Sequence, residues 1–259
     1  MRMSTAELRP PESPEEIYAN TMDNLFSWPS MERPFFKEFN PWNGLDDLRV
    51  LDVGCGAGRM ISHFIDEGVP ADQITGVDTN PRMVELARAR VPGTHIIEAD
   101  IAEWGATTLR RTLERELPSE DLGTDGKGIS FDLITANMVF GYMSRIQIQR
   151  AMKNISSLMS NRGLFIFVDT NPLSYVDSGE IGTWVKRQTP WGTSEPSFNH
   201  DYEAICNELA LRPSIGLSTP GLKKLHIVNG ADRPEFEAYA SRPDSPRVGA
   251  RFVKRPKRV

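Results

Sequence analysis

Residues 50–58 read Val50-Leu51-Asp52-Val53-Gly54-Cys55-Gly56-Ala57-Gly58, an apolar run that ends in a series of alternating glycines. The apolar run predicts a short strand that is buried on both faces. The glycines let a ligand approach the backbone, and the helix expected at 60–66 offers free N–H groups at its first turn. A glycine turn after a strand is common, so this stretch alone indicates only a βα unit.

Strands and helices alternate on either side of this turn. We expect further strands at 74–77, 95–97, 131–135, 164–168 and 248–253, and helices at 81–90, around Leu109, Leu113 and Leu117, and after the capping residue Ser144. Strands that alternate with helices at this spacing predict a parallel sheet. The expected fold is α/β: a Rossmann-like, doubly wound, seven-stranded, mostly parallel sheet with an N-terminal helical lid and a cap insertion after the fifth strand.

The rest of the chain is divided around this core, which we place at 46–170. We expect a disordered N-terminus at 1–12, a helical lid at 13–45, and a loop-rich cap or substrate segment at 171–200. A segment at 201–255, with a helix at 201–210, is expected to complete the sheet, and 256–259 form a basic tail.

Acidic residues follow the next two strands. Asp78 comes after the second strand, where a carboxylate can accept hydrogen bonds from both hydroxyls of a ribose. Asp100 follows the third strand, where it can accept from an adenine amine, with Ile101 as an apolar wall beside it. Because the carboxyl ends of parallel strands meet at one edge of the sheet, these residues and the glycine loop predict an adenosine-type cofactor there.

The glycine spacing distinguishes between two such cofactors. The dinucleotide fingerprint is G-x-G-x-x-G, whereas this chain has G-x-G-x-G, with Arg59 in the place of the last fingerprint glycine. A pyrophosphate would also not need Asp100. An NAD-dependent oxidoreductase is therefore the weaker alternative.

Four motifs in order resemble those of the class I S-adenosylmethionine-dependent methyltransferases. They are the 51–58 loop, Asp78, the turn at 99–101, and the stretch 131–137, which reads Phe-Asp-Leu-Ile-Thr-Ala-Asn. The resemblance covers roughly residues 49–170. It implies an enzyme that uses S-adenosylmethionine as its cofactor.

The resemblance also implies a set of cofactor contacts. The glycines would lie against the methionine and ribose parts, Asp52 would position the amino group, and Arg59 could reach the methionine carboxylate. Asp78 would hold the ribose hydroxyls, and Asp100 and Ile101 would bracket the adenine. The full set is Asp52, Gly54, Gly56, Gly58, Arg59, Asp78, Thr79, Met83, Asp100, Ile101, Asn137 and Met138.

The catalytic residues are less clearly marked. Methyl transfer from a sulfonium is an in-line displacement, so a general base is needed only if the acceptor must lose a proton. Many relatives carry a histidine after the fourth strand, but here 137–142 reads Asn-Met-Val-Phe-Gly-Tyr. The candidates are His200, Tyr18 and Tyr142. His200 could instead be a structural residue, the tyrosines could only close the pocket, and proximity alone could suffice.

Composition limits the partners. The net charge of −5 gives no electrostatic reason to expect nucleic acid as a partner. The place where base-flipping enzymes carry an Asn/Asp-Pro-Pro-aromatic motif reads Asn137-Met138-Val139-Phe140. Cys55 and Cys206 show no metal-ligand spacing, so we expect no metal site. No apolar run is long enough to span a membrane or resembles a signal peptide, and a cytoplasmic location is expected.

The variable segments around a standard core resemble those of small-molecule methyltransferases of specialised metabolism. This resemblance implies a small-molecule acceptor, methylated at oxygen, nitrogen or carbon, and a role in biosynthesis. The alternatives are a protein or RNA methyltransferase on the same fold and a non-catalytic module that only binds S-adenosylmethionine. A homo-oligomer that exchanges its N-terminal helices is a further possibility.

Overall fold

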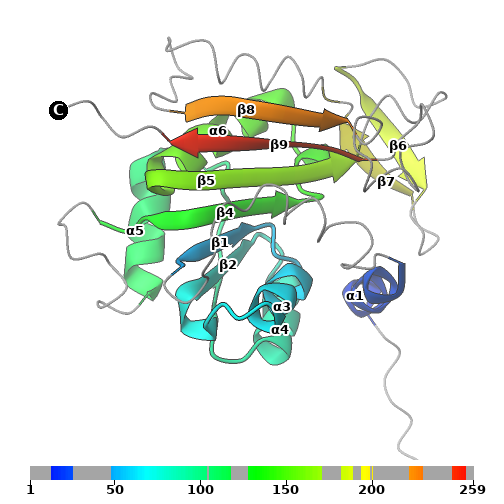
Figure 1. Ribbon diagram of the computed structural model, residues 1–259. Helices are drawn as coiled ribbons and strands as arrows, with labels where there is room; N and C mark the ends of the chain where they lie inside the picture. The colour runs from blue at the N-terminus through cyan, green and yellow to red at the C-terminus, as the bar shows by residue number, and fades with distance from the viewer. Residues whose placement is uncertain are drawn as a thin grey trace, which may run out of the picture.

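The computed structural model describes residues 13–25, 48–103, 105–117, 128–170, 182–188, 194–198, 200, 222–229 and 247–254. Seven strands form one sheet in the order β3-β2-β1-β4-β5-β9-β8 (Figure 1). They are β1 (Val50–Val53), β2 (Ile74–Asp78), β3 (His95–Glu98), β4 (Phe131–Asn137), β5 (Met159–Thr170), β8 (Leu222–Asn229) and β9 (Arg247–Lys254). The pairs from β3 to β5 are parallel, and β9 pairs antiparallel with β5 and β8.

Helices cover both faces of this sheet. One apolar cluster joins α5 (Ala106–Glu116) and α6 (Arg145–Leu158) to strand residues such as Leu51 and Val53. A second cluster joins α3 (Arg59–Asp66) and α4 (Pro81–Arg90) to strand residues such as Val50. Successive strand residues point to opposite faces, and all four residues of β1 are buried, so both faces of the strand are covered. The prediction of a mostly parallel sheet flanked by helices is confirmed.

Capping residues begin three of the helices. The Ser144 hydroxyl accepts from the Gln147 backbone N–H, and the Gln147 side chain accepts from the Ser144 N–H, which is a capping box. Asn80 caps α4, where Pro81 occupies the first turn. Ser13 and Glu16 exchange the same kind of bonds at the start of α1 (Pro14–Leu25).

Several sequence-based expectations need correction. The fifth strand was expected at 164–168, but β5 begins at Met159, directly after α6, and continues to Thr170. The segment 171–200 is not all loop, since β6 (Trp184–Gln188) and β7 (Ser194–Phe198) form an antiparallel hairpin. Residues 222–229, which show no clear pattern, form β8. The predicted helix at 201–210, most of the lid and both tails lie outside the described residues.

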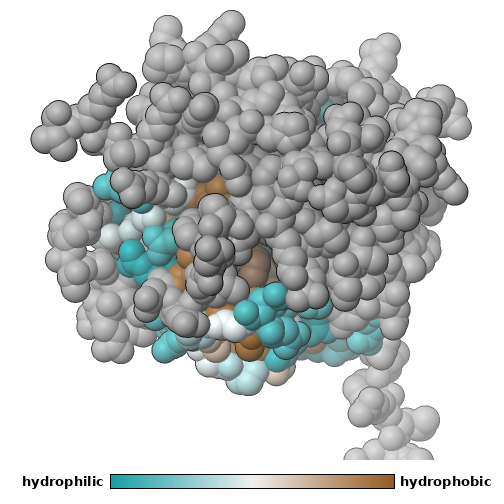
Figure 2. All heavy atoms as spheres, in the orientation of Figure 1, coloured by the Kyte–Doolittle hydropathy of each residue, from teal (hydrophilic) through white to brown (hydrophobic). Residues whose placement is uncertain are grey.

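On the face drawn in Figure 2, apolar described residues lie in the lower half with hydrophilic ones around them. None of the helices in the described ranges is long and apolar enough to cross a membrane. Those same ranges contain no group of histidine, cysteine and acidic residues that could hold a metal ion.

Candidate active site

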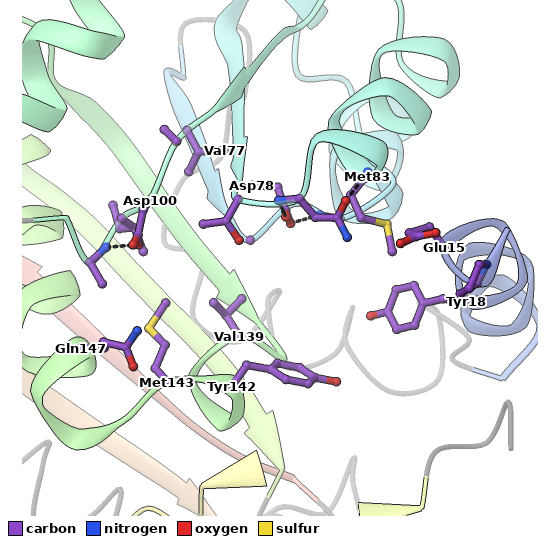
Figure 3. Close-up of a pocket in the computed structure, with 18 of the residues that line it drawn as sticks. Glu15, Tyr18, Val77, Asp78, Met83, Asp100, Val139, Tyr142, Met143 and Gln147 are labelled. Atoms are coloured by element: carbon purple, nitrogen blue, oxygen red, sulfur yellow. Dashed lines mark hydrogen bonds between the residues drawn. The ribbon is translucent and has the colours of Figure 1, made fainter. Parts of the chain in front are cut away.

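A cavity of about 780 Å³ opens at the carboxyl ends of β1, β2 and β3. This is the point where β1 has β2 on one side and β4 on the other, and ligands of open α/β sheets bind at such a reversal of strand order. Three groups of residues surround it (Figure 3): the loops after the strands, the helix α1, and the short helix η3 (Phe140–Tyr142) with the start of α6.

The glycine loop shapes the wall of the cavity. Gly54, Gly56 and Gly58 have φ angles of 63°, 52° and 80°, which favour glycine over residues with a side chain. A Cβ on Gly54 would lie 2.5 Å from Val139 Cγ2, whereas one on Gly56 would meet no atom within 4 Å. The absence of a side chain at Gly54 therefore lets the loop lie close to Val139, and Gly56 exposes its backbone to the cavity. Gly58 packs against Ala87 of α4 and does not line the cavity.

Asp78 already holds the loop in place. Its Oδ2 accepts from the Gly56 N–H at 2.8 Å, and its Oδ1 accepts from the Asn80 N–H at 2.9 Å. A carboxylate offers about four lone-pair sites, so each oxygen keeps one for a ligand. Two acceptor sites side by side match the two adjacent hydroxyls of a ribose. Thr79 and Met83, also predicted, line the cavity beside Asp78.

Asp100 follows β3 and lines the cavity near Asp78, because the Ala99 N–H donates to the Asp78 carbonyl. Asp100 Oδ1 accepts from the Ala102 N–H at 2.7 Å, which orients the carboxylate. Ile101 is 4% exposed and also lines the cavity. A carboxylate beside an apolar surface suits an adenine, whose exocyclic amine donates and whose ring needs a nonpolar contact.

A smaller cavity of about 50 Å³ adjoins the first and shares Gly54, Gly56 and Tyr18 with it. Four more of the predicted cofactor residues line this space: Asp52, Arg59, Asn137 and Met138. Thr135 Oγ1 donates to Asp52 Oδ1 at 2.7 Å, so the buried carboxylate is held in a fixed orientation. The small cavity thus combines cationic, anionic and amide side chains, which suits the charged end of an amino acid.

Met138 has a φ of 60°, and no other non-glycine residue of the described ranges has a positive φ. Such a backbone is strained for a residue with a side chain and persists where the surrounding structure holds it. Met138 follows the last residue of β4 and lines the small cavity. The strain therefore occurs where the chain turns from the sheet toward the cavity.

Two of the three catalytic candidates line the large cavity, and His200 does not. Tyr18 and Tyr142 both line the large cavity, and Figure 3 shows them extending from α1 and from η3 toward the same opening. His200 is 1% exposed and is not among the described residues that line the cavity. Its Nε2 lies 2.9 Å from both Phe140 O and Met143 O. Because carbonyl oxygens only accept, Nε2 carries the proton and cannot take one from an acceptor. The ring of His200 therefore binds the turn at Phe140–Met143 through Nε2.

Burial shifts the pKa of two titratable side chains, Cys55 and His200. Burial, followed by the nearby carboxylates of Asp52 and Asp78, raises the pKa of the Cys55 thiol well above its ordinary range, so this thiol stays protonated and unreactive. Burial also lowers the pKa of His200, which keeps its imidazole neutral near pH 7.

Several lining residues were not predicted from the sequence. They are Pro14, Glu15, Ile17, Val77, Asn80, Ala99, Ala102, Val139, Met143 and Gln147. Asn80 could have been found, because an asparagine before a proline is a typical start of a helix and this helix begins directly after Asp78. The residues from α1 and from the start of α6 carry no such signal, since only the packing of these helices brings them to the cavity.

Residues 51–165 match the family model described as a methyltransferase domain. Trans-aconitate 2-methyltransferase of Rhizobium etli is 42% identical over 59 residues, which make up 23% of this chain and 23% of that protein. The enzyme of the same name from Rhizobium rhizogenes is 34% identical over 95 residues, or 37% of this chain and 28% of that protein. The chain thus spans about a quarter of the length of the curated relatives it matches.

The fold is also that of solved structures. A structure described as an S-adenosylmethionine-dependent methyltransferase from Clostridium acetobutylicum superimposes with a TM-score of 0.58 at 15% identity, covering 92% of this chain and 98% of that one. A likeness at this level of identity concerns the fold.

Proposed function

We propose that this chain, whose residues 51–165 form a methyltransferase domain of the class I S-adenosylmethionine-dependent family, transfers a methyl group from S-adenosylmethionine to a small-molecule acceptor. The family resemblance of the four ordered motifs is confirmed by the match over these residues. The fold agrees with that of solved methyltransferases, which supports S-adenosylmethionine as the cofactor.

The observation that carries the proposal is the arrangement around Asp78. The carboxylate accepts from Gly56 N–H and Asn80 N–H and keeps one acceptor site on each oxygen. Asp100 lines the same cavity, and Asp52 and Arg59 line the adjoining small one. In this proposal the ribose binds at Asp78, the adenine at Asp100, and the methionine end in the small cavity.

The chain's own residues have to orient the acceptor and exclude water. The bound cofactor supplies an electrophilic methyl group on a sulfonium, and the acceptor approaches it in line. Tyr18 and Tyr142 lie on opposite sides of the opening and can donate hydrogen bonds to an acceptor. Catalysis then rests mainly on alignment, with either tyrosine able to orient a polar group of the acceptor.

The helix α1 is the lid of this proposal. It contributes Glu15, Ile17 and Tyr18 to the cavity. Arg82 of α4 joins Glu16 of α1 at 2.5 Å, so an ion pair connects the lid to the helix beside the ribose site. A lid held in this way can exclude water from the reacting groups.

The charge of the lining bears on the acceptor. The curated relatives are named for trans-aconitate, a tricarboxylate. The described residues that line the large cavity include the carboxyl groups of Glu15, Asp78 and Asp100 and no lysine, arginine or histidine. Asp78 and Asp100 are assigned to the cofactor, which leaves the carboxyl group of Glu15 on the acceptor side, and like charges disfavour a polyanion there. We therefore propose a neutral or cationic small-molecule acceptor and regard trans-aconitate as the first compound to compare with it.

Calorimetric titration with S-adenosylhomocysteine, with NAD in parallel, tests the cofactor. Binding of the first and not of the second is expected, and binding of NAD alone would overturn the proposal. Turnover of labelled S-adenosylmethionine with trans-aconitate, phenols and amines then tests the acceptor. Faster turnover of trans-aconitate than of any neutral or cationic compound would contradict the charge argument. A cytoplasmic location, a role in specialised metabolism and exchange of N-terminal helices between subunits stay predictions.

A further inference from the structure

The turn after β4 joins the sheet to the acceptor side of the cavity. Phe140 is fully buried and packs edge-on against Phe167 of β5, with ring centroids 5.2 Å apart. Two residues later Tyr142 is 49% exposed, and Tyr142 and Met143 line the large cavity (Figure 3). The conformation of η3 therefore decides where these two side chains lie.

Asp169 of β5 holds the N–H groups of this turn. Its Oδ2 accepts from the Phe140 N–H at 2.7 Å and from the Gly141 N–H at 3.1 Å. The residue is 2% exposed. Burying a carboxylate is costly unless it is well hydrogen-bonded, and such bonds to a charged acceptor are stronger than neutral ones.

His200 holds the carbonyl groups of the same turn. Its Nε2 donates to Phe140 O and Met143 O, both at 2.9 Å. The ring also lies against Phe198 of β7, with centroids 4.5 Å apart. The turn is thus bonded from β5 through its N–H groups and from the end of the β6–β7 hairpin through its carbonyls.

Gly141 shows how closely these groups enclose the turn. A Cβ at this position would lie 3.2 Å from Ser197 Oγ and 3.3 Å from Asp169 Oδ1. Both distances are short for a carbon atom, so residues of β5 and β7 both pack directly against the backbone at Gly141. Movement of the turn toward these two side chains is therefore opposed.

We propose that Asp169 and His200 are positioning residues that fix Tyr142 and Met143 against the methyl acceptor. The inference rests on the proposed function, because it assigns the acceptor side to this part of the cavity. In this inference His200 acts on the acceptor site by holding the turn in place. The β6–β7 hairpin then supports the acceptor site, although its described residues do not line the cavity.

Fluorine NMR of the full chain labelled with 3-fluorotyrosine tests the proposal without a known acceptor. The chain has five tyrosines, so five signals are expected, and the variant Tyr142→Phe identifies one of them. His200→Ala and Asp169→Ala should shift or broaden the Tyr142 signal while the Tyr18 signal stays in place. His200→Gln, whose amide nitrogen can donate from nearly the same position, should restore it.

Amide hydrogen exchange measures the hold on the turn itself. Asp169→Ala should speed the exchange of the Phe140 and Gly141 amides by roughly tenfold or more, because each loses a charged acceptor. Asp132→Ala is the matched control: this β4 carboxylate accepts from the Ser160 hydroxyl and the Arg49 N–H near the amino end of the strand. It should leave both the exchange of the turn and the Tyr142 signal unchanged.

The outcomes separate this inference from the proposed function. An unchanged Tyr142 signal in folded His200→Ala, or an equal effect of Asp132→Ala, would overturn the positioning role. If Asp169→Ala does not fold, Asp169→Asn replaces it, since its amide oxygen can still accept and only a partial shift is expected. Affinity for S-adenosylhomocysteine should stay within about threefold of wild type in all variants, because neither residue touches the ribose or adenine walls. Failure of the wild type to bind S-adenosylhomocysteine would refute the cofactor site and leave the NMR result to stand alone.

Discussion

Replacement of Asp78 by alanine tests the cofactor site most directly. Its two oxygens bond Gly56 N–H and Asn80 N–H and keep one acceptor site each for the ribose hydroxyls. A hydrogen bond to a charged group is worth about 1.5–3 kcal/mol. The loss of two such bonds to the ligand amounts to about 3 kcal/mol at the lower end, which corresponds to a more than roughly 100-fold weaker binding of S-adenosylhomocysteine.

Asp78→Asn should remove only part of this binding free energy. The amide oxygen can still accept from one backbone N–H and one ribose hydroxyl, but the amide nitrogen faces the second backbone N–H, donor against donor. We expect an intermediate loss of roughly tenfold. Asp72→Ala is the control, because it removes an exposed carboxylate beside the amino end of β2.

The assay is isothermal titration calorimetry, accompanied by thermal unfolding to show that each variant is folded. Asp72→Ala should bind as wild type does. Binding by folded Asp78→Ala within about threefold of wild type would refute the ribose assignment, since a ligand that uses both oxygens of Asp78 cannot be indifferent to their loss.

Three further predictions concern the loop, the buried histidine and the lid. Gly54→Ala should lower the melting temperature and weaken S-adenosylhomocysteine binding. A φ of 63° costs about 1–2 kcal/mol for a residue with a side chain, and the new Cβ would lie 2.5 Å from Val139 Cγ2. Calorimetry that matches wild type would contradict the close approach of Gly54 to Val139. Burial lowers the pKa of His200 below its ordinary value of about 6.5, so protonation favours the unfolded chain, and the free energy of unfolding should fall as the pH drops from about 6.5 toward the folded pKa. Urea titrations at several pH values measure this, and an unchanged slope in His200→Gln would assign it to other groups. Glu16→Gln and Arg82→Gln should each weaken S-adenosylhomocysteine binding by no more than about fivefold, since the ion pair is partly exposed. The double variant should weaken binding by no more than either single variant does, because both remove the same ion pair. Additive losses would show that this ion pair does not connect the lid to α4.

The features that the sequence determines are those written in neighbouring residues. The strand Val50–Val53 and the helix Pro81–Arg90 have the predicted bounds, because a mostly apolar run that ends in glycines and a helix-starting proline are local signals. The positions of Asp78 and Asp100 follow from the same logic. Once the strands are parallel, the residues after them must share one edge of the sheet.

The tertiary structure decided what connects distant segments. The placement of β9 between β5 and β8, and the β6–β7 hairpin, depend on pairing that no short pattern encodes. His200 and Phe140 are 60 residues apart, and Asp169 and Phe140 are 29 apart, yet both hydrogen-bond the same turn. A histidine in a polar segment is as compatible with a base as with a buried donor. Only the packing of β7 against η3, which removes the ring from water and sets Nε2 between two carbonyls, distinguishes the two.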